Sequence, residues 1–137
     1  ALGYDSVAMA RRKVGDYAGE IAERQIALTM CLEQKSYLCQ LWQRVNLGAA
    51  FAELGNIDES EKHLDLAEDL NLEPSQIDRA QIALARAQIA IARGEHKRAC
   101  SSSKRAYDLA QLLPKVESTA VLIERIEKVR QSACQKW

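Results

Sequence analysis

The chain has 137 residues, which is enough for one compact domain or one short array of repeats. Its 19 Lys and Arg side chains balance 19 Asp and Glu side chains, and no basic stripe dominates, so the composition argues against a nucleic-acid-binding protein. No stretch longer than eight residues lacks a charged side chain, so we expect no membrane-spanning helix. The chain begins at Ala without a signal-peptide pattern, as expected of a processed or excised part of a longer protein.

Small apolar residues dominate the hydrophobic part of the composition. The chain is 47% hydrophobic but only 5% aromatic, and it contains two prolines and six glycines. So few breakers favour long helices, and a β-sandwich would need turn signals every 8–12 residues. We therefore predict an all-α fold.

Three glycines recur along the chain at nearly constant spacing. Gly15, Gly55 and Gly94 are 40 and then 39 residues apart (55 − 15 and 94 − 55). Small residues recur in step, seven positions before and twelve positions after each glycine: Ala8, Gly48 and Ala87, then Ala27, Ala67 and Ala106. This self-similarity predicts a repeated helix hairpin whose two helices approach closely at the small residues.

Residues next to the glycines support the hairpin interpretation. Glycine readily adopts the left-handed conformation that ends a helix. Asp16 and Asn56 follow their glycines and are good N-cap residues for the next helix. Glu59 stands three residues after Asn56, at the spacing of a capping box.

The pattern resembles that of the tetratricopeptide repeat (TPR) family, most fully in the middle copy. That copy carries the family-like residues Leu47, Gly48, Phe51, Gly55, Ile57, Leu64, Ala67 and Pro74. The first copy departs from the family pattern with Arg11 and Arg24 at normally apolar positions, and the third has His96 in place of an aromatic residue. The resemblance covers residues 1–112 and implies an α-solenoid, a right-handed stack of three antiparallel hairpins. The repeats would span residues 1–36, 37–75 and 76–113 of a single domain.

The period of this repeat is longer than the family's usual 34 residues. The additional residues fall between Ala27 and Leu41 and between Ala67 and Ala80, where they are expected to lengthen the helices by about a turn and a half. Such long units resemble those of bacterial signalling and transcription-regulatory proteins.

Residues 117–134 read as one more helix, with Leu122, Ile126, Val129 and Ala133 on one face. An amphipathic last helix with a polar outer face caps an open-ended stack. The alternative is a helix that docks on a partner.

The TPR resemblance implies that the first helix of each hairpin lines a groove for another polypeptide. Chaperone-binding members hold a C-terminal carboxylate with Lys and Asn, but the corresponding pairs here are Asp5 and Met9, Val45 and Ala49, and Leu84 and Gln88. A carboxylate clamp is therefore absent, and we expect a partner with hydrophobic anchors. Trp42 is the strongest anchor candidate, the alternative being that it packs between hairpins. The predicted groove residues are Met9, Arg12, Trp42, Val45, Ala49, Glu53, Gln81, Leu84 and Gln88.

Four cysteines are more than a helical domain of this size needs. Cys31 and Cys39 are symmetric about Lys35, so they would face each other across an antiparallel helix pair. Cys100 and Cys134 form the second candidate pair, which would staple the last helix. Two disulfides would place the domain outside the cytoplasm, for instance in a bacterial periplasm. The alternatives are a single disulfide or four free, buried thiols.

The sequence shows no constellation typical of an enzyme or a metal site. There are only two histidines and no Gly-rich phosphate loop. His96 and Cys100 share a helix face, but nothing completes four metal ligands, so we expect no metal and no cofactor. A protein- or peptide-binding module is the leading hypothesis. The alternatives are self-association, with the groove filled by the chain itself or by a second copy, and regulation by a small ligand.

Overall fold

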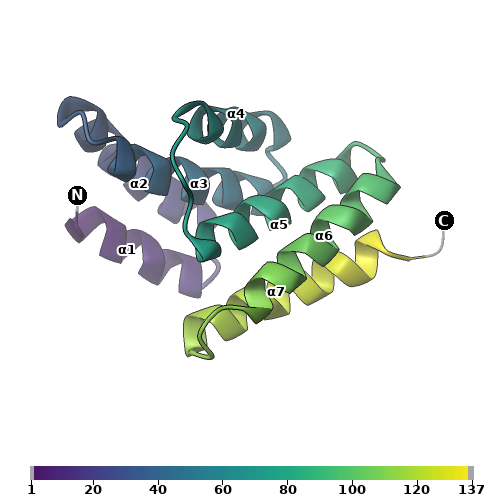
Figure 1. Cartoon of the computed structure of the whole chain (residues 1–137). Helices are drawn as coiled ribbons and strands as arrows, with labels where there is room; N and C mark the ends of the chain where they lie inside the picture. The colour runs from purple at the N-terminus through teal and green to yellow at the C-terminus, as the bar shows by residue number, and fades with distance from the viewer. Residues whose placement is uncertain (1, 136–137) are drawn as a thin grey trace. The chain divides into compact units, whose positions relative to one another are not determined.

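The computed structural model describes residues 2–135 and is drawn in Figure 1. Over this range the chain forms seven α-helices and no strand, which confirms the all-α prediction. The helices are α1 (Leu2–Lys13), α2 (Tyr17–Glu33), α3 (Tyr37–Glu53), α4 (Ile57–Asp69), α5 (Gln76–Ala92), α6 (His96–Gln111) and α7 (Glu117–Ala133). None of them, within residues 2–135, has the length and apolar character needed to cross a lipid bilayer.

The helices group into two compact units, Ala1–Glu73 and Pro74–Trp137. The N-terminal unit contains α1–α4 and the C-terminal unit contains α5–α7. Each predicted repeat, 1–36, 37–75 and 76–113, contains one pair of consecutive helices, and these paired helices pack against each other. The sequence interpretation of all seven helices as one domain stays a prediction.

The three glycines form the same turn at the end of α1, α3 and α5. Gly15, Gly55 and Gly94 have positive φ angles of 78°, 77° and 73°. Each glycine N–H donates to the carbonyl three residues before it, and the N–H of the following residue donates to the carbonyl five residues before that residue. These two bonds define the Schellman motif, and they satisfy helix carbonyls that would otherwise lack partners. The periodic glycines therefore mark repeated helix ends.

The turn between α2 and α3 has the same hydrogen bonds without a glycine. Lys35 takes the left-handed conformation with φ of 54°, and Ser36 N–H donates to the carbonyl of Cys31. The Ser36 hydroxyl then accepts from Cys39 N–H at 3.3 Å and caps α3. The turn thereby brings Cys31 and Cys39 to the same end of the α2–α3 pair.

Of the two predicted N-cap residues, Asp16 makes a side-chain capping hydrogen bond and Asn56 does not. Asp16 caps α2, since its carboxylate accepts from Gly19 N–H at 2.9 Å. The capping box of Asn56 and Glu59 is wrong, because the Asn56 side chain makes no capping hydrogen bond. Glu59 points instead toward His63, whose Nε2 lies 3.8 Å from the carboxylate.

The small residues that recur at fixed offsets from the three glycines lie in the interior. All six predicted small positions are buried. A Cβ atom added at Gly48 would lie 2.6 Å from Leu64 Cδ2 of α4, and the Ser60 hydroxyl donates to the carbonyl of Gly48 at 2.6 Å. The close approach of α3 and α4 therefore requires a residue without a side chain at this position.

Each unit has its own apolar core. In the N-terminal unit, a cluster from α2 and α3 contains Ile21, Leu28, Leu47, Ala50 and Phe51. In the C-terminal unit, α7 contributes Leu122 and Ile126 to a cluster shared with α5 and α6. Ala133 packs with Ala90 and Ala99 in a second cluster, so the buried face of the last helix is the one predicted.

The residues that lengthen the two intervals between repeats form helix in the first interval and partly a non-helical connection in the second. Helices α2 and α3 have 17 residues each and meet in a short turn, so the first interval extends the helices as predicted. In the second interval α4 ends at Asp69 and α5 begins at Gln76, so part of the length forms a non-helical connection. Asn71 begins that connection in the left-handed conformation, with φ of 55°.

Candidate functional site

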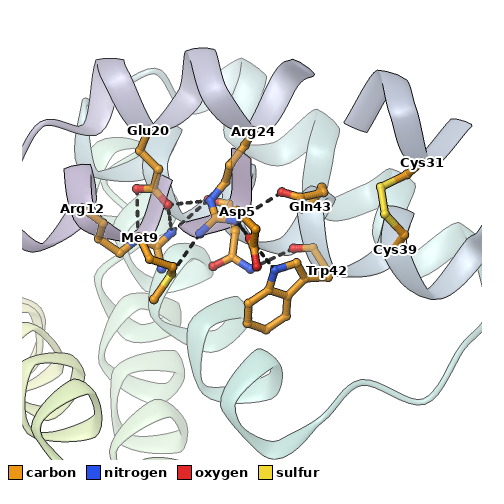
Figure 2. A network of polar contacts seen from close by, with 10 residues as sticks. Asp5, Met9, Arg12, Glu20, Arg24, Cys31, Cys39, Trp42 and Gln43 are labelled. Carbon is orange, nitrogen blue, oxygen red and sulfur yellow. Dashed lines mark hydrogen bonds and ion pairs between the residues drawn. A yellow bond between two sulfur atoms is a disulfide. The ribbon is translucent and has the colours of Figure 1, made fainter. Parts of the chain in front are cut away.

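A network of polar side chains joins the first three helices of the N-terminal unit (Figure 2). Spacings of three, four or seven residues put its members from α1 and from α2 on one face of each helix, and its members from α3 lie within one turn of that helix. We call it the α1–α3 network. It consists of Asp5, Met9 and Arg12 from α1, Glu20 and Arg24 from α2, and Trp42, Gln43 and Asn46 from α3.

Arg24 is the centre of this network and is fully buried. Its Nε donates to Glu20 at 2.7 Å, and its Nη1 donates to Asp5 at 2.8 Å and to Gln43 at 3.1 Å. Its Nη2 lies 3.1 Å from the sulfur of Met9. A buried guanidinium is tolerated only when its charge and its donors are matched, and here three helices supply the partners.

Glu20 balances two guanidinium groups. Its carboxylate is fully buried and lies 2.6 Å from Arg12 Nη2 as well as 2.7 Å from Arg24 Nε. Arg12 also donates to the main-chain carbonyl of Asn46 at 3.2 Å, which ties α1 to α3. With Asp5 included, two acidic and two basic side chains meet, so the network has no net charge.

Asp5 and Trp42 lie at the solvent-accessible edge of the network. The indole N–H of Trp42 donates to Asp5 Oδ1 at 2.9 Å, and Figure 2 shows Asp5 between Trp42 and the guanidinium of Arg24. The Asp5 side chain is 28% exposed, and Trp42 and Met9 are partly exposed. These bonds hold an aromatic ring and a thioether in defined positions at the surface.

The structure divides the predicted groove residues into two groups. Met9, Arg12, Trp42, Glu53 and Gln88 are partly exposed. Four predicted contact positions are instead buried, so they have no open surface for a ligand in this structure: Val45, Ala49, Gln81 and Leu84.

The physical reason for this correction is the packing of α3 and α5. Helix α3 packs against both α2 and α4, and α5 packs against both α6 and α7. Leu84, for example, lies in the apolar cluster that α5 shares with α6 and α7. Helical offset alone assigned these residues to a groove, but it does not show which helix faces are covered.

Both predicted cysteine pairs lie at disulfide distance, and the structure joins them. The Cα atoms of Cys31 and Cys39 are 5.5 Å apart, and those of Cys100 and Cys134 are 4.7 Å apart. The alternatives of a single disulfide and of four free thiols are not what the structure contains. The first pair lies beside the α1–α3 network, since Cys39 precedes Trp42 by one helical turn (Figure 2). The second pair links α6 to the end of α7.

The cysteine pairing also bears on the metal alternative. Cys100 is bonded to Cys134, so it has no free thiolate to share with His96. Within residues 2–135, no three His, Cys, Asp or Glu side chains gather in an arrangement that could hold a metal ion.

Sequence reasoning missed the ion pairs of Glu20 and Arg24. One signal was present, because Arg24 stands where the TPR resemblance predicts an apolar residue. Asp5 likewise stands where that resemblance would place a basic residue of a carboxylate clamp. Two such departures in the same repeat point to a polar contact between α1 and α2, but the partners from α3 are far away in the sequence.

Comparisons with known proteins found no match for this chain. No protein-family model matches it, and neither a curated protein nor a solved structure is similar enough to count as a match. Proposals about its function therefore depend on its own residues.

Proposed function

We propose that the chain is a non-catalytic protein- or peptide-binding module, the sensing or docking part of a larger signalling or envelope protein. Its architecture would be a TPR-like, right-handed stack of hairpins capped by α7. The repeated Schellman turns at Gly15, Gly55 and Gly94 support this architecture. So do the buried small residues at equivalent positions of the three helix pairs.

The observation that carries the proposal is the surface formed by Met9 and Trp42. Both side chains are partly exposed, and both belong to the α1–α3 network, which has no net charge. Aromatic side chains held in fixed positions are favourable anchors, because they lose less side-chain entropy when a partner binds. A segment with apolar side chains is the partner that fits such a surface.

A peptide selection tests this proposal. Random 12-residue peptides displayed on phage would be selected on the purified chain, and the enriched sequences would be synthesised for calorimetric titration. Trp42→Ala is expected to weaken binding at least tenfold, whereas Tyr37→Ala, an exposed aromatic residue of the same helix, is expected to leave it unchanged. Equal affinities of the two variants would refute the assignment of Trp42 as an anchor.

The two disulfides support a location outside the cytoplasm, such as a bacterial periplasm. Alkylation before and after reduction, followed by mass spectrometry on protein prepared without reductant, counts the free thiols. We expect four thiols to be alkylated only after reduction. Four free thiols after exposure to an oxidising buffer would contradict this location.

Self-association is a second candidate function, favoured by one group of exposed apolar side chains. Leu32, Tyr37 and Leu38 around the α2–α3 turn are 47%, 62% and 71% exposed. A second copy of the chain would cover them. Sedimentation equilibrium over a range of concentrations tests this, and Leu38→Lys is expected to shift any dimer toward monomer.

A further inference from the structure

The two oxygens of the Asp5 carboxylate differ in their hydrogen bonds. Its Oδ1 accepts two hydrogen bonds, from Arg24 Nη1 at 2.8 Å and from Trp42 Nε1 at 2.9 Å. No donor from the described part of the chain reaches its Oδ2, although the side chain is 28% exposed. The α1–α3 network therefore offers a charged acceptor to solvent at this edge.

The surroundings of this acceptor favour a cation. Trp42 is fixed next to the carboxylate by its own indole hydrogen bond, and the residue is partly exposed. The face of an indole ring attracts guanidinium and ammonium groups, and a partly desolvated position strengthens that attraction. Met9 lies on the other side of Arg24 from Gln43 and adds a polarizable apolar contact for the stem of a long side chain (Figure 2).

The same network disfavours an anion. All three nitrogens of the Arg24 guanidinium have partners, and Arg12 is held by Glu20 and by the carbonyl of Asn46. Recognition of a carboxylate or phosphate needs open donors, and breaking these buried pairs to supply them is costly. A ligand group that donates hydrogen bonds therefore fits this edge, whereas one that only accepts them does not.

We propose that the partner segment presents an arginine or lysine side chain to Asp5 and Trp42. The charged end donates to Asp5 Oδ2, and the stem lies along the indole ring. This inference rests on the proposed function, because it specifies the chemistry of a peptide that the module binds. The occupant is a peptide segment with one basic side chain next to apolar ones.

The test uses peptides selected from the random 12-residue library. We expect enriched sequences to share a Lys or Arg at one position. In a synthetic peptide with Arg at that position, replacement by citrulline keeps the shape and removes the charge. Its affinity for the unmodified chain is expected to fall about tenfold or more, measured by calorimetry or by fluorescence anisotropy.

Variants of the protein complete the test. Asp5→Asn keeps an acceptor for Trp42 and Arg24 but places an amide NH₂ where Oδ2 was. This variant should bind the Arg peptide as weakly as the unmodified chain binds the citrulline peptide. Glu33→Gln removes the same charge from an exposed position of α2 and should leave affinity unchanged. Circular dichroism reports whether Asp5→Asn is folded, and the citrulline comparison needs no protein variant.

The outcomes of this test separate failure of this inference from failure of the proposed function. Enriched peptides without a shared basic residue, or equal affinity for the Arg and citrulline peptides, overturn this inference and leave the binding module standing. Failure to enrich any peptide above background overturns the proposed function, and this inference with it. A basic consensus, together with a loss of affinity in Asp5→Asn but not in Glu33→Gln, supports both the proposed function and this inference.

Discussion

At the scale of single residues, Arg24 shows how a charge is accommodated at a position that the TPR resemblance predicts to be apolar. Its guanidinium has no exposure, and its partners come from α1, α2 and α3. Such a group adds little net stability compared with an apolar residue, but it penalises any arrangement that separates the three helices. The network therefore defines how Asp5 and Trp42 are placed.

Removal of Arg24 should lower the free energy of unfolding by more than the ion pairs of Arg24 contribute to it. Arg24→Met leaves Glu20 buried with only Arg12 as its partner, and we expect the free energy of unfolding to fall by about 3 kcal/mol. The double variant Arg24→Met with Glu20→Gln removes the uncompensated charge and should recover most of that loss. Urea denaturation followed by circular dichroism measures both, and a double variant no more stable than the single one would contradict this explanation.

His63 provides a pH-dependent contribution to stability. Its ring is buried and stacks on Phe51, with a distance of 5.6 Å between ring centroids. Burial, as the largest cause, and the positive charges of Arg44 and, to a lesser degree, Lys62 together lower the pKa of His63 to about 4, although the charge of Glu59 opposes them. The imidazole is therefore neutral in the folded chain, where its Nδ1 lies 3.2 Å from Arg44 Nη1.

The unfolded chain binds a proton at this histidine more readily than the folded chain. The ordinary pKa of 6.5 applies to the unfolded state, so stability present above pH 6.5 is lost as the pH falls from 6.5 toward 4. We expect a loss of about 1–2 kcal/mol, since solvent screens part of the full effect. Urea denaturation at several pH values measures the free energy of unfolding, which should depend less on pH in His63→Gln than in the unmodified chain. Identical slopes for the two proteins would contradict the prediction.

At the scale of helices, the α3–α4 pair depends on one position without a side chain. A methyl group at Gly48 would overlap Leu64, which is buried in the same pair. Alanine favours helix formation over glycine by about 1 kcal/mol, so only a steric cost can reverse the sign of this substitution. Gly3, in α1, has no atom within 4 Å of an added Cβ and offers the same chemical change without a clash.

We expect Gly48→Ala to destabilise the chain by about 1–3 kcal/mol relative to Gly3→Ala. The difference in thermal and urea unfolding between the two variants isolates the steric effect. Ser60 is expected to lose its hydrogen bond to the Gly48 carbonyl if α4 moves away, which faster amide exchange in α4 would show. Equal stability of the two variants would mean that Leu64 moves aside at no cost.

The elements were largely predictable from the sequence, because their signals are local. Glycine with a positive φ, the capping side chain of Asp16 and the small residues at fixed offsets all act within one hairpin. The Cys31–Cys39 pair was predictable for the same reason, since both residues flank one turn. The capping box at Asn56 failed because Glu59 has a competing partner in His63 one turn further along α4.

At the scale of the whole molecule, each of the two units carries one disulfide. The Cys31–Cys39 bond closes a loop with a sequence separation of 8, and the Cys100–Cys134 bond closes one with a separation of 34. A longer closed loop restricts the unfolded chain more. The chain-entropy relation gives about 2.5 kcal/mol for the first and about 3.8 kcal/mol for the second.

Removal of the Cys100–Cys134 bond should therefore destabilise its unit more than removal of the Cys31–Cys39 bond destabilises the other. We expect Cys100→Ala with Cys134→Ala to cost about 1 kcal/mol more than Cys31→Ala with Cys39→Ala. Hydrogen exchange followed by mass spectrometry resolves the two units in each variant. A larger loss in the N-terminal unit would show that loop length does not govern the effect.

The sequence proposed the two cysteine pairs but left open whether they are bonded. By itself it determined the helical class, the three turns with their hairpins and the buried face of the last helix. These features depend on periodicity and on residues that are neighbours along a turn or a helix face. Only the tertiary structure decided that Val45, Ala49, Gln81 and Leu84 are covered. It also decided that Arg24 meets Asp5 and Gln43, and that Trp42 bonds Asp5 across 37 positions of the chain. Burial and long-range pairing depend on which helix faces pack together, and no local pattern specifies that choice.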